Sequence, residues 1–388
     1  MIITSRALIK NFLKDNSINE IQKTIYKEKR NYGIDLLRIF SMINIINLHI
    51  NLKARLLTLN SNNNKFKNIL RLETFSYFSV DCFGLISGIV GFNKYKFSNL
   101  IYLWFISSFY SVMKYTYLFI ENRTKLKNLI LSFFPILIGL HWYVNAYFIM
   151  YLFLPFINFG IKLLSKKTFR NLVFFYILFF SIFYIISALL KMTCHNFLLN
   201  GYSSSWLTIL YIIGSYFGKY ILKSINKSNK LIKCFYLINY IGFSFLSSEI
   251  FFITGKKYLI NYISPTTLFQ ALSLVMIFYS IEIKNKYIIK IIKFMTPLVF
   301  SVTLIHLILF TINLKIVLSF FRSIRELKNT LIFFKIYIIS IIIFMLSILI
   351  DFFRLMIFNI FKIREICLFI ERIFPKVFDK FLLIKKFL

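Results

Sequence analysis

The stretch NYGIDLLRIFSMINIINLHINL, residues 31–52, decides the fold class of this chain. It is apolar and about as long as the 20 residues that a helix needs to cross a bilayer. It nevertheless carries Asp35, Arg38 and His49 among its Leu, Ile and Phe residues. An Arg at the centre of a membrane helix costs about 2.5–3.5 kcal/mol, so ionisable groups there usually face a protein interior or a wet cavity. These three residues are therefore the first candidates for function.

The rest of the chain repeats this apolar character. Its 388 residues are 59% hydrophobic and 20% aromatic, with a mean hydropathy of +0.73. Apolar blocks of membrane-spanning length lie near 33–52, 72–92, 98–120, 129–159, 171–190, 205–222, 234–253, 264–282, 292–314 and 331–361. We expect an all-α, polytopic integral membrane bundle of about ten transmembrane helices. The block 129–159 is the one in which we most expect the helix to break, because it contains Pro135, Gly139 and Pro155.

The charge of the chain fits a membrane setting better than a nucleic-acid partner. Lys and Arg number 48 against 14 acidic residues, a net charge of +34. With the N-terminus inside, the cytoplasmic segments carry roughly twice as many basic residues as the outer ones. Basic loops also suit anionic lipid headgroups, and no soluble basic domain offers a nucleic-acid groove. We therefore expect a cytoplasmic basic segment at 1–30, a membrane domain at 31–361 and a cytoplasmic amphipathic tail at 362–388.

The polar residues of the first span share one side of the helix. Arg38 and His49 are eleven residues apart, which brings them within about 20° on the helix wheel and about 16 Å apart along the axis. Asp35 precedes Arg38 by three residues, within reach of an ion pair. Two interpretations are open: Arg38 extends to the inner headgroups and His49 marks the outer interface, or both face a functional cavity.

Three later stretches offer further candidates. Ser87 and Gly88 lie on a small-residue face, which is typical either of close helix packing or of a smooth wall for a long substrate. His141, Trp142 and Tyr143 begin another span and are either interfacial anchors or part of a site. His306 lies in the apolar stretch TPLVFSVTLIHLILF, residues 296–310, as a packing residue or a functional one. The four Cys residues are isolated, so neither a metal site nor a disulfide framework is indicated.

Taken together, these pieces resemble acyltransferase family 3, a family of integral membrane acyltransferases. The matching residues occur in the family's order: Ile34, Asp35, Leu37, Arg38 and His49 in the first span, then Ser87 and Gly88, Trp142 and Tyr143 with Pro155, and finally Phe300, Leu304, Ile305 and His306. The stretch SSWLTILYIIGSYFGKY, residues 204–220, is similar to a segment of a low-GC bacterial branch. The resemblance runs from about residue 30 to residue 315.

The resemblance implies transfer of an acyl group, often acetyl, from acyl-CoA to a hydroxyl of a cell-surface or lipid-linked glycan. It implies a bacterial cytoplasmic membrane, with acetyl-CoA as a co-substrate and no tightly bound cofactor. Since His suits proton transfer near neutral pH, His49 is the candidate base; an acyl-imidazole intermediate on His49 is the competing mechanism. Arg38, oriented by Asp35, is expected to hold the donor. Ser87, Gly88, His141, Trp142, Tyr143 and His306 are candidates for lining the passage or binding the acceptor.

Two other classes of function remain open from the sequence. A transporter or flippase of a glycolipid or polysaccharide precursor also uses intramembrane Arg and His residues to bind a substrate in transit. A sensor or scaffold of the cell envelope needs neither thioester turnover nor a substrate path. Release of free CoA thiol in the presence of a glycan separates the first class from the other two.

Overall fold

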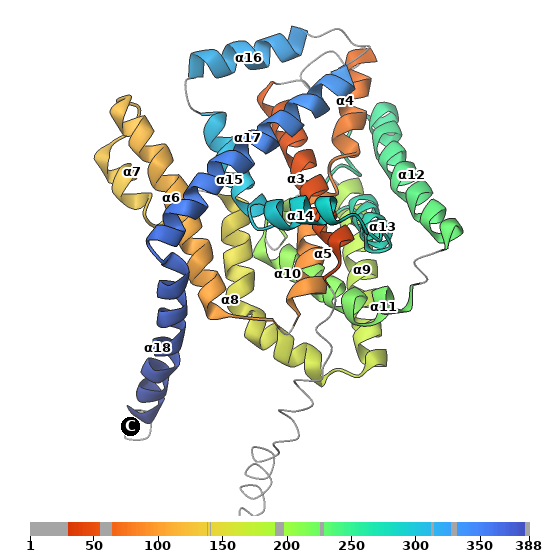
Figure 1. Cartoon of the computed structure of the whole chain (residues 1–388). Helices are drawn as coiled ribbons and strands as arrows, with labels where there is room; N and C mark the ends of the chain where they lie inside the picture. Colours follow the sequence, from red (N-terminus) through yellow and green to blue (C-terminus); the bar gives the residue numbers. More distant parts are fainter. Residues whose placement is uncertain are drawn as a thin grey trace, which may run out of the picture.

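The computed structural model describes residues 30–54, 64–92, 94–137, 139, 141–190, 198–225, 229–311, 314–326 and 332–384. Most of the basic segment 1–30 and the end of the tail 362–388 therefore lie outside the described residues, as do Cys194 and its neighbour His195. Every regular element in the described ranges is helical (Figure 1). The all-α membrane bundle expected from the sequence is confirmed.

The helices follow the apolar blocks closely. They are α3 (Tyr32–Lys53), α4 (Asn64–Thr74), α5 (Ser79–Gly91), α6 (Phe97–Ile120), α7 (Leu126–Leu131), α8 (Trp142–Leu163), α9 (Lys166–Leu189), α10 (Ser204–Tyr216), α11 (Leu222–Ser224), α12 (Lys230–Thr254), α13 (Pro265–Tyr279), α14 (Lys286–Met295), α15 (Val299–Leu309), α16 (Leu314–Glu326), α17 (Ile332–Ile360) and α18 (Ile363–Ile384). A 3-10 turn, η2 (Leu199–Gly201), precedes α10, and a π-helical turn, η3 (Phe217–Ile221), follows it.

Six described spans are long and apolar enough to cross a membrane: α3, α4 with α5, α8, α9, α12 and α17. The pair α14 and α15 makes a seventh if it crosses as one span, bent by 58° at a break that contains Pro297. The number is lower than the ten apolar blocks partly because blocks such as 205–222 and 264–282 form shorter helices. The chain is a multi-pass membrane protein.

The block that contains Pro135, Gly139 and Pro155 does not form a single helix. The block 129–159 is divided between α7, which ends at Leu131, and α8, which begins at Trp142. Pro135 and Gly139 lie in the turns between them, and Gly139 has a left-handed φ of 68°. Pro155 lies inside α8. The break therefore falls at the first two of the three suspected positions, and it places Trp142 at the start of a full-length helix.

Helix α3 lies at the centre of the bundle (Figure 1). It packs against α5, α13, α14, α15 and α17, which is why most of its polar side chains are buried. Its first turn is capped by Asn31, whose side-chain oxygen accepts a hydrogen bond from the Ile34 amide at 3.1 Å. Such a cap satisfies a helix-start amide that has no partner within the helix. The central position surrounds Arg38 and His49 with protein rather than lipid.

Helices α5 and α10 cross at very short range because glycines remove bulk from both. A Cβ added to Gly88 would lie 2.1 Å from the Tyr211 carbonyl oxygen, and one added to Gly214 would lie 2.1 Å from the Leu85 carbonyl oxygen. Small residues allow helix backbones to approach in this way inside membranes. The small-residue face that contains Gly88 is therefore a helix-packing surface.

Candidate active site

A cavity of about 980 Å³ lies between α3 and the helices around it. Five of the residues predicted from the sequence line it: Arg38, His49, Ser87, Trp142 and Tyr143. They come from α3, α5 and α8, so three spans that are far apart in the sequence contribute to one space. The cavity is also lined by α15 through Val299, Phe300 and Thr303. Arg38 and His49 thus reach one cavity, as the second interpretation of their shared helix face requires.

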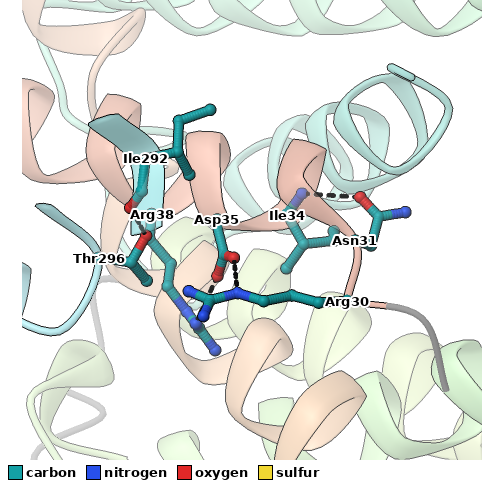
Figure 2. A network of polar contacts seen from close by, with 7 residues as sticks. All are labelled: Arg30, Asn31, Ile34, Asp35, Arg38, Ile292 and Thr296. Carbon is teal, nitrogen blue, oxygen red and sulfur yellow. Dashed lines mark hydrogen bonds and ion pairs between the residues drawn. The ribbon is translucent and has the colours of Figure 1, made fainter. Parts of the chain in front are cut away.

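Arg38 is held by a buried carboxylate. Nη1 of Arg38 donates a hydrogen bond to Oδ1 of Asp35 at 3.0 Å, and Nε of Arg30 donates to Oδ2 at 2.5 Å. Figure 2 shows Asp35 between these two guanidinium groups. Asp35 is only 4% exposed, so two cations compensate its buried charge. The expected ion pair is present, and Arg30 is an additional partner.

The rest of the Arg38 guanidinium is available to a ligand. Among the described residues, Asp35 is the acceptor of its one side-chain hydrogen bond. A guanidinium carries five N–H donors in a planar fork, so several remain without a protein acceptor here. Arg38 also lies within electrostatic range of the phenol groups of Tyr143 and Tyr147, which line the same cavity.

His49 forms a pair with His306 from α15. Nδ1 of His49 lies 2.6 Å from Nε2 of His306, and Nδ1 of His306 lies 2.5 Å from the Val302 carbonyl oxygen. Because a carbonyl can only accept, Nδ1 of His306 must carry a proton, and in the neutral ring Nε2 is then the acceptor. Nδ1 of His49 is therefore the donor of the shared hydrogen bond. In a neutral His49 this leaves Nε2 unprotonated, and no described residue hydrogen-bonds to it.

The other predicted residues take different positions. Ser87 lines the cavity while its hydroxyl donates to the Phe83 carbonyl at 2.8 Å. Gly88 faces α10 and does not line the cavity. His141 precedes the first residue of α8 and is likewise absent from the lining. His306 is fully buried behind His49 and is absent from the lining.

A family comparison gives this arrangement its chemical class. The model of acyltransferase family 3, described as an acyltransferase domain, matches residues 31–349. The chain belongs to this family. No curated protein and no solved structure matches it significantly. The match covers α3 through most of α17, and with it every residue of the cavity lining.

The acyltransferase carries cavity residues that the sequence did not single out for the site. Tyr147 follows Tyr143 by four residues, so the helical period alone placed it on the same face of α8. Tyr202, Lys257 and Tyr262 come from the connections before α10 and α13, where no periodic pattern points to a site. Asn51 lines the cavity two residues after His49. Connecting segments therefore line the cavity together with the spans.

Proposed function

We propose that this membrane acyltransferase moves an acetyl group from acetyl-CoA to a hydroxyl of a cell-surface or lipid-linked glycan. The observation that supports this proposal is the single cavity lined by both Arg38 and His49. A transferase of this kind needs a base for a neutral hydroxyl and a cation for a charged donor or a developing oxyanion. The two side chains supply these groups from one helix.

His49 is the proposed general base. A sugar hydroxyl is a poor nucleophile until its proton is removed in the transition state. Nε2 of His49 takes this proton, the hydroxyl oxygen forms a bond to the acyl carbon, and the carbon–sulfur bond of the thioester breaks. The CoA sulfur then receives the proton from His49. His306 supports the imidazolium by its hydrogen bond to Nδ1, a positioning role behind the reacting atom.

Arg38 is the proposed donor-binding residue. A guanidinium is permanently charged and its fork suits phosphate or carboxylate groups, and it also stabilises an oxyanion. Arg38 lies in the second turn of α3, whereas His49 lies near the end of that helix. With the N-terminus of the chain in the cytoplasm, as the basic segments favour, Arg38 lies nearer the side that holds acyl-CoA. His49 then lies nearer the outer side, where a glycan is presented.

The test is thioester cleavage that depends on an acceptor. Purified protein is incubated with acetyl-CoA and a glycan fraction, and free CoA thiol and acetylated glycan are both measured. We expect both products to appear together and both to be lost in His49→Ala at equal folded protein. Glycan acetylation that persists in His49→Ala would refute the base assignment. Absence of thiol release with every bacterial surface glycan offered would refute the proposed reaction.

A further inference from the structure

Four aromatic side chains meet at one part of the cavity lining. Tyr77, Trp142, Tyr202 and Tyr262, named here the aromatic cluster, all line it. The Trp142 ring centroid lies 4.5 Å from that of Tyr202 and 6.1 Å from that of Tyr262. The Tyr262 centroid lies 5.1 Å from that of Tyr202 and 5.0 Å from that of Tyr77. Four separate segments of the chain thus converge on one aromatic surface.

Three polar groups line the same cavity as the aromatic cluster. Glu73 is 7% exposed, and its Oε1 lies 3.6 Å from Nζ of Lys257, which is longer than a hydrogen bond. Asn51 is 1% exposed, and neither its Oδ1 nor its Nδ2 has a hydrogen-bond partner among the described residues. A buried amide without partners costs about 1–3 kcal/mol, so such a group indicates a missing ligand or water.

The backbone around the cluster is shaped to hold it. Gly201 has a left-handed φ of 89°, and a Cβ there would lie 2.4 Å from the Cβ of Tyr262. This glycine lets the connection before α10 pack directly against the connection before α13. The latter is fixed by Ser264, which caps α13, and by Thr266, whose hydroxyl donates to the Leu259 carbonyl at 3.0 Å. The aromatic surface is therefore built into the fold.

We propose that the aromatic cluster, with Asn51, Glu73 and Lys257, is the subsite for one pyranose ring of the acceptor. This proposal rests on the proposed function and names the part of the site that recognises the sugar. A pyranose presents a face of C–H groups, which packs on aromatic rings, and an edge of hydroxyls, which needs both donors and acceptors. The amide of Asn51, the carboxylate of Glu73 and the ammonium of Lys257 supply that mixture. Pockets of this kind combine an aromatic lining with a few polar groups that fix orientation.

The charge of the site favours a sugar over a cationic ligand. Aromatic cages also bind quaternary ammonium groups, but nearby protein cations repel a cationic ligand. Here Lys257 and Arg38 line the same cavity, and Glu73 is the one carboxylate among its described lining residues. A neutral, hydroxyl-rich ring meets no repulsion from this set.

The subsite and the proposed base share one cavity. Asn51 follows His49 by two residues on α3, which corresponds to about 3 Å along the axis. Both residues line the cavity. The proposed base and the proposed subsite therefore border one continuous space.

Direct binding provides the first test. The probes are the methyl β-glycosides of glucose, galactose and N-acetylglucosamine, added to the full-length protein in detergent and observed by saturation-transfer NMR. We expect saturation of the ring C–H protons in at least one probe, and about a tenfold weaker affinity in Tyr202→Ala and in Asn51→Ala. The control Tyr287→Ala removes a tyrosine that is 81% exposed on α14 and should bind as the unaltered protein does.

Kinetics provides the second test and separates the two proposals. We expect Tyr202→Ala and Glu73→Gln to raise the KM for the glycan about tenfold or more, with a much smaller change in the KM for acetyl-CoA. Acyl transfer with an unchanged glycan KM in both variants would overturn the subsite and leave the proposed function standing. Glycoside binding that is lost in the variants, without any acyl transfer by the unaltered protein, would support the subsite and overturn the proposed function. Failure of all three glycosides to bind would overturn the subsite.

Discussion

His49 Nδ1 lies 2.6 Å from His306 Nε2, and the two rings stack with centroids 4.9 Å apart. The pair joins α3 to α15 through residues that are 257 positions apart in the chain. The Val302 carbonyl fixes the proton on the far side of His306, so the hydrogen-bond order sets the tautomer of His49. Under the proposed function, this relationship makes His49 the member that meets the substrate and His306 the member that positions it.

The first prediction separates these two roles. His49→Ala removes the base and should lower the rate of acyl transfer by about 10²–10⁴-fold, the usual contribution of general acid–base catalysis. His306→Ala leaves Nε2 of His49 in place and should cause a smaller loss. Initial rates at equal folded protein test this order. An equal or larger loss in His306→Ala would mean that the base is on α15.

The second prediction concerns the shape of the Arg38 side chain. Arg38→Lys keeps the charge but replaces a planar fork with a point charge. If Arg38 binds Asp35 and a donor group together, the substitution should cost about 2 kcal/mol or more of transition-state stabilisation. Glycan acetylation is measured in cells that lack the native gene and carry Arg38→Lys or Arg38→Ala, with membrane abundance matched. Near-normal acetylation by the Lys variant would show that α3 only needs a charge at this position.

The third prediction concerns orientation in the membrane. The connection between α10 and α12 carries Lys219 and Lys223, with Lys227 in the part outside the described residues and Lys230 as the first residue of α12. Basic segments of this kind favour the cytoplasm. In a chain whose native Cys are replaced by Ala, Lys223→Cys should not react with a membrane-impermeant thiol reagent in intact cells. Lys256→Cys, at the opposite end of α12, should react. The reverse pattern would invert the proposed topology.

The fourth prediction tests the close crossing of α5 and α10. Gly214→Ala places a methyl group 2.1 Å from the Leu85 carbonyl oxygen, so the helices must separate or the protein must lose stability. Gly242→Ala on α12 is the matched control, because a Cβ added at Gly242 would have nothing within 4 Å of it. Thermal unfolding in detergent should show a large loss for Gly214→Ala and an unchanged or slightly higher midpoint for Gly242→Ala. Equal midpoints would show that the crossing is looser than described.

The fifth prediction concerns a buried ion pair outside the cavity. Arg354 on α17 donates from Nε and Nη2 to the two oxygens of Asp351 at 2.8 and 2.7 Å, and Tyr110 on α6 donates to Asp351 at 2.7 Å. Both charged residues are almost fully buried, so Arg354→Ala leaves a carboxylate uncompensated. We expect a loss of about 3–5 kcal/mol in the free energy of unfolding.

Two further variants check the explanation of that loss. The double substitution of Asp351→Leu and Arg354→Met replaces the pair by apolar groups and should recover much of the stability. Arg170→Ala changes an exposed Arg on α9 and should have little effect. A double variant as unstable as Arg354→Ala would contradict the explanation by an unpaired buried charge.

The sequence by itself determined the helices and the polar face that α3 presents to the cavity. Apolar blocks of spanning length form helices because a bilayer leaves no other partner for their backbone groups. The period of 3.6 residues puts Arg38 and His49 on one face of α3, and spacing alone brings Asp35 to Arg38. These features are local, so they do not depend on which helices become neighbours.

Only the tertiary structure decided which residues of other helices these α3 side chains meet. His306 pairs with His49, and Tyr202 meets Tyr262, because helix packing joins segments that no sequence period connects. The same packing turned Gly88 toward α10, although its small-residue face was also compatible with a substrate passage. Lipid is as apolar as a neighbouring helix. Hydrophobicity alone therefore does not decide which face of a membrane helix contacts lipid and which contacts protein. The choice between lipid, helix and cavity is therefore made by complementary shape and hydrogen bonding, which exist only once the bundle has formed.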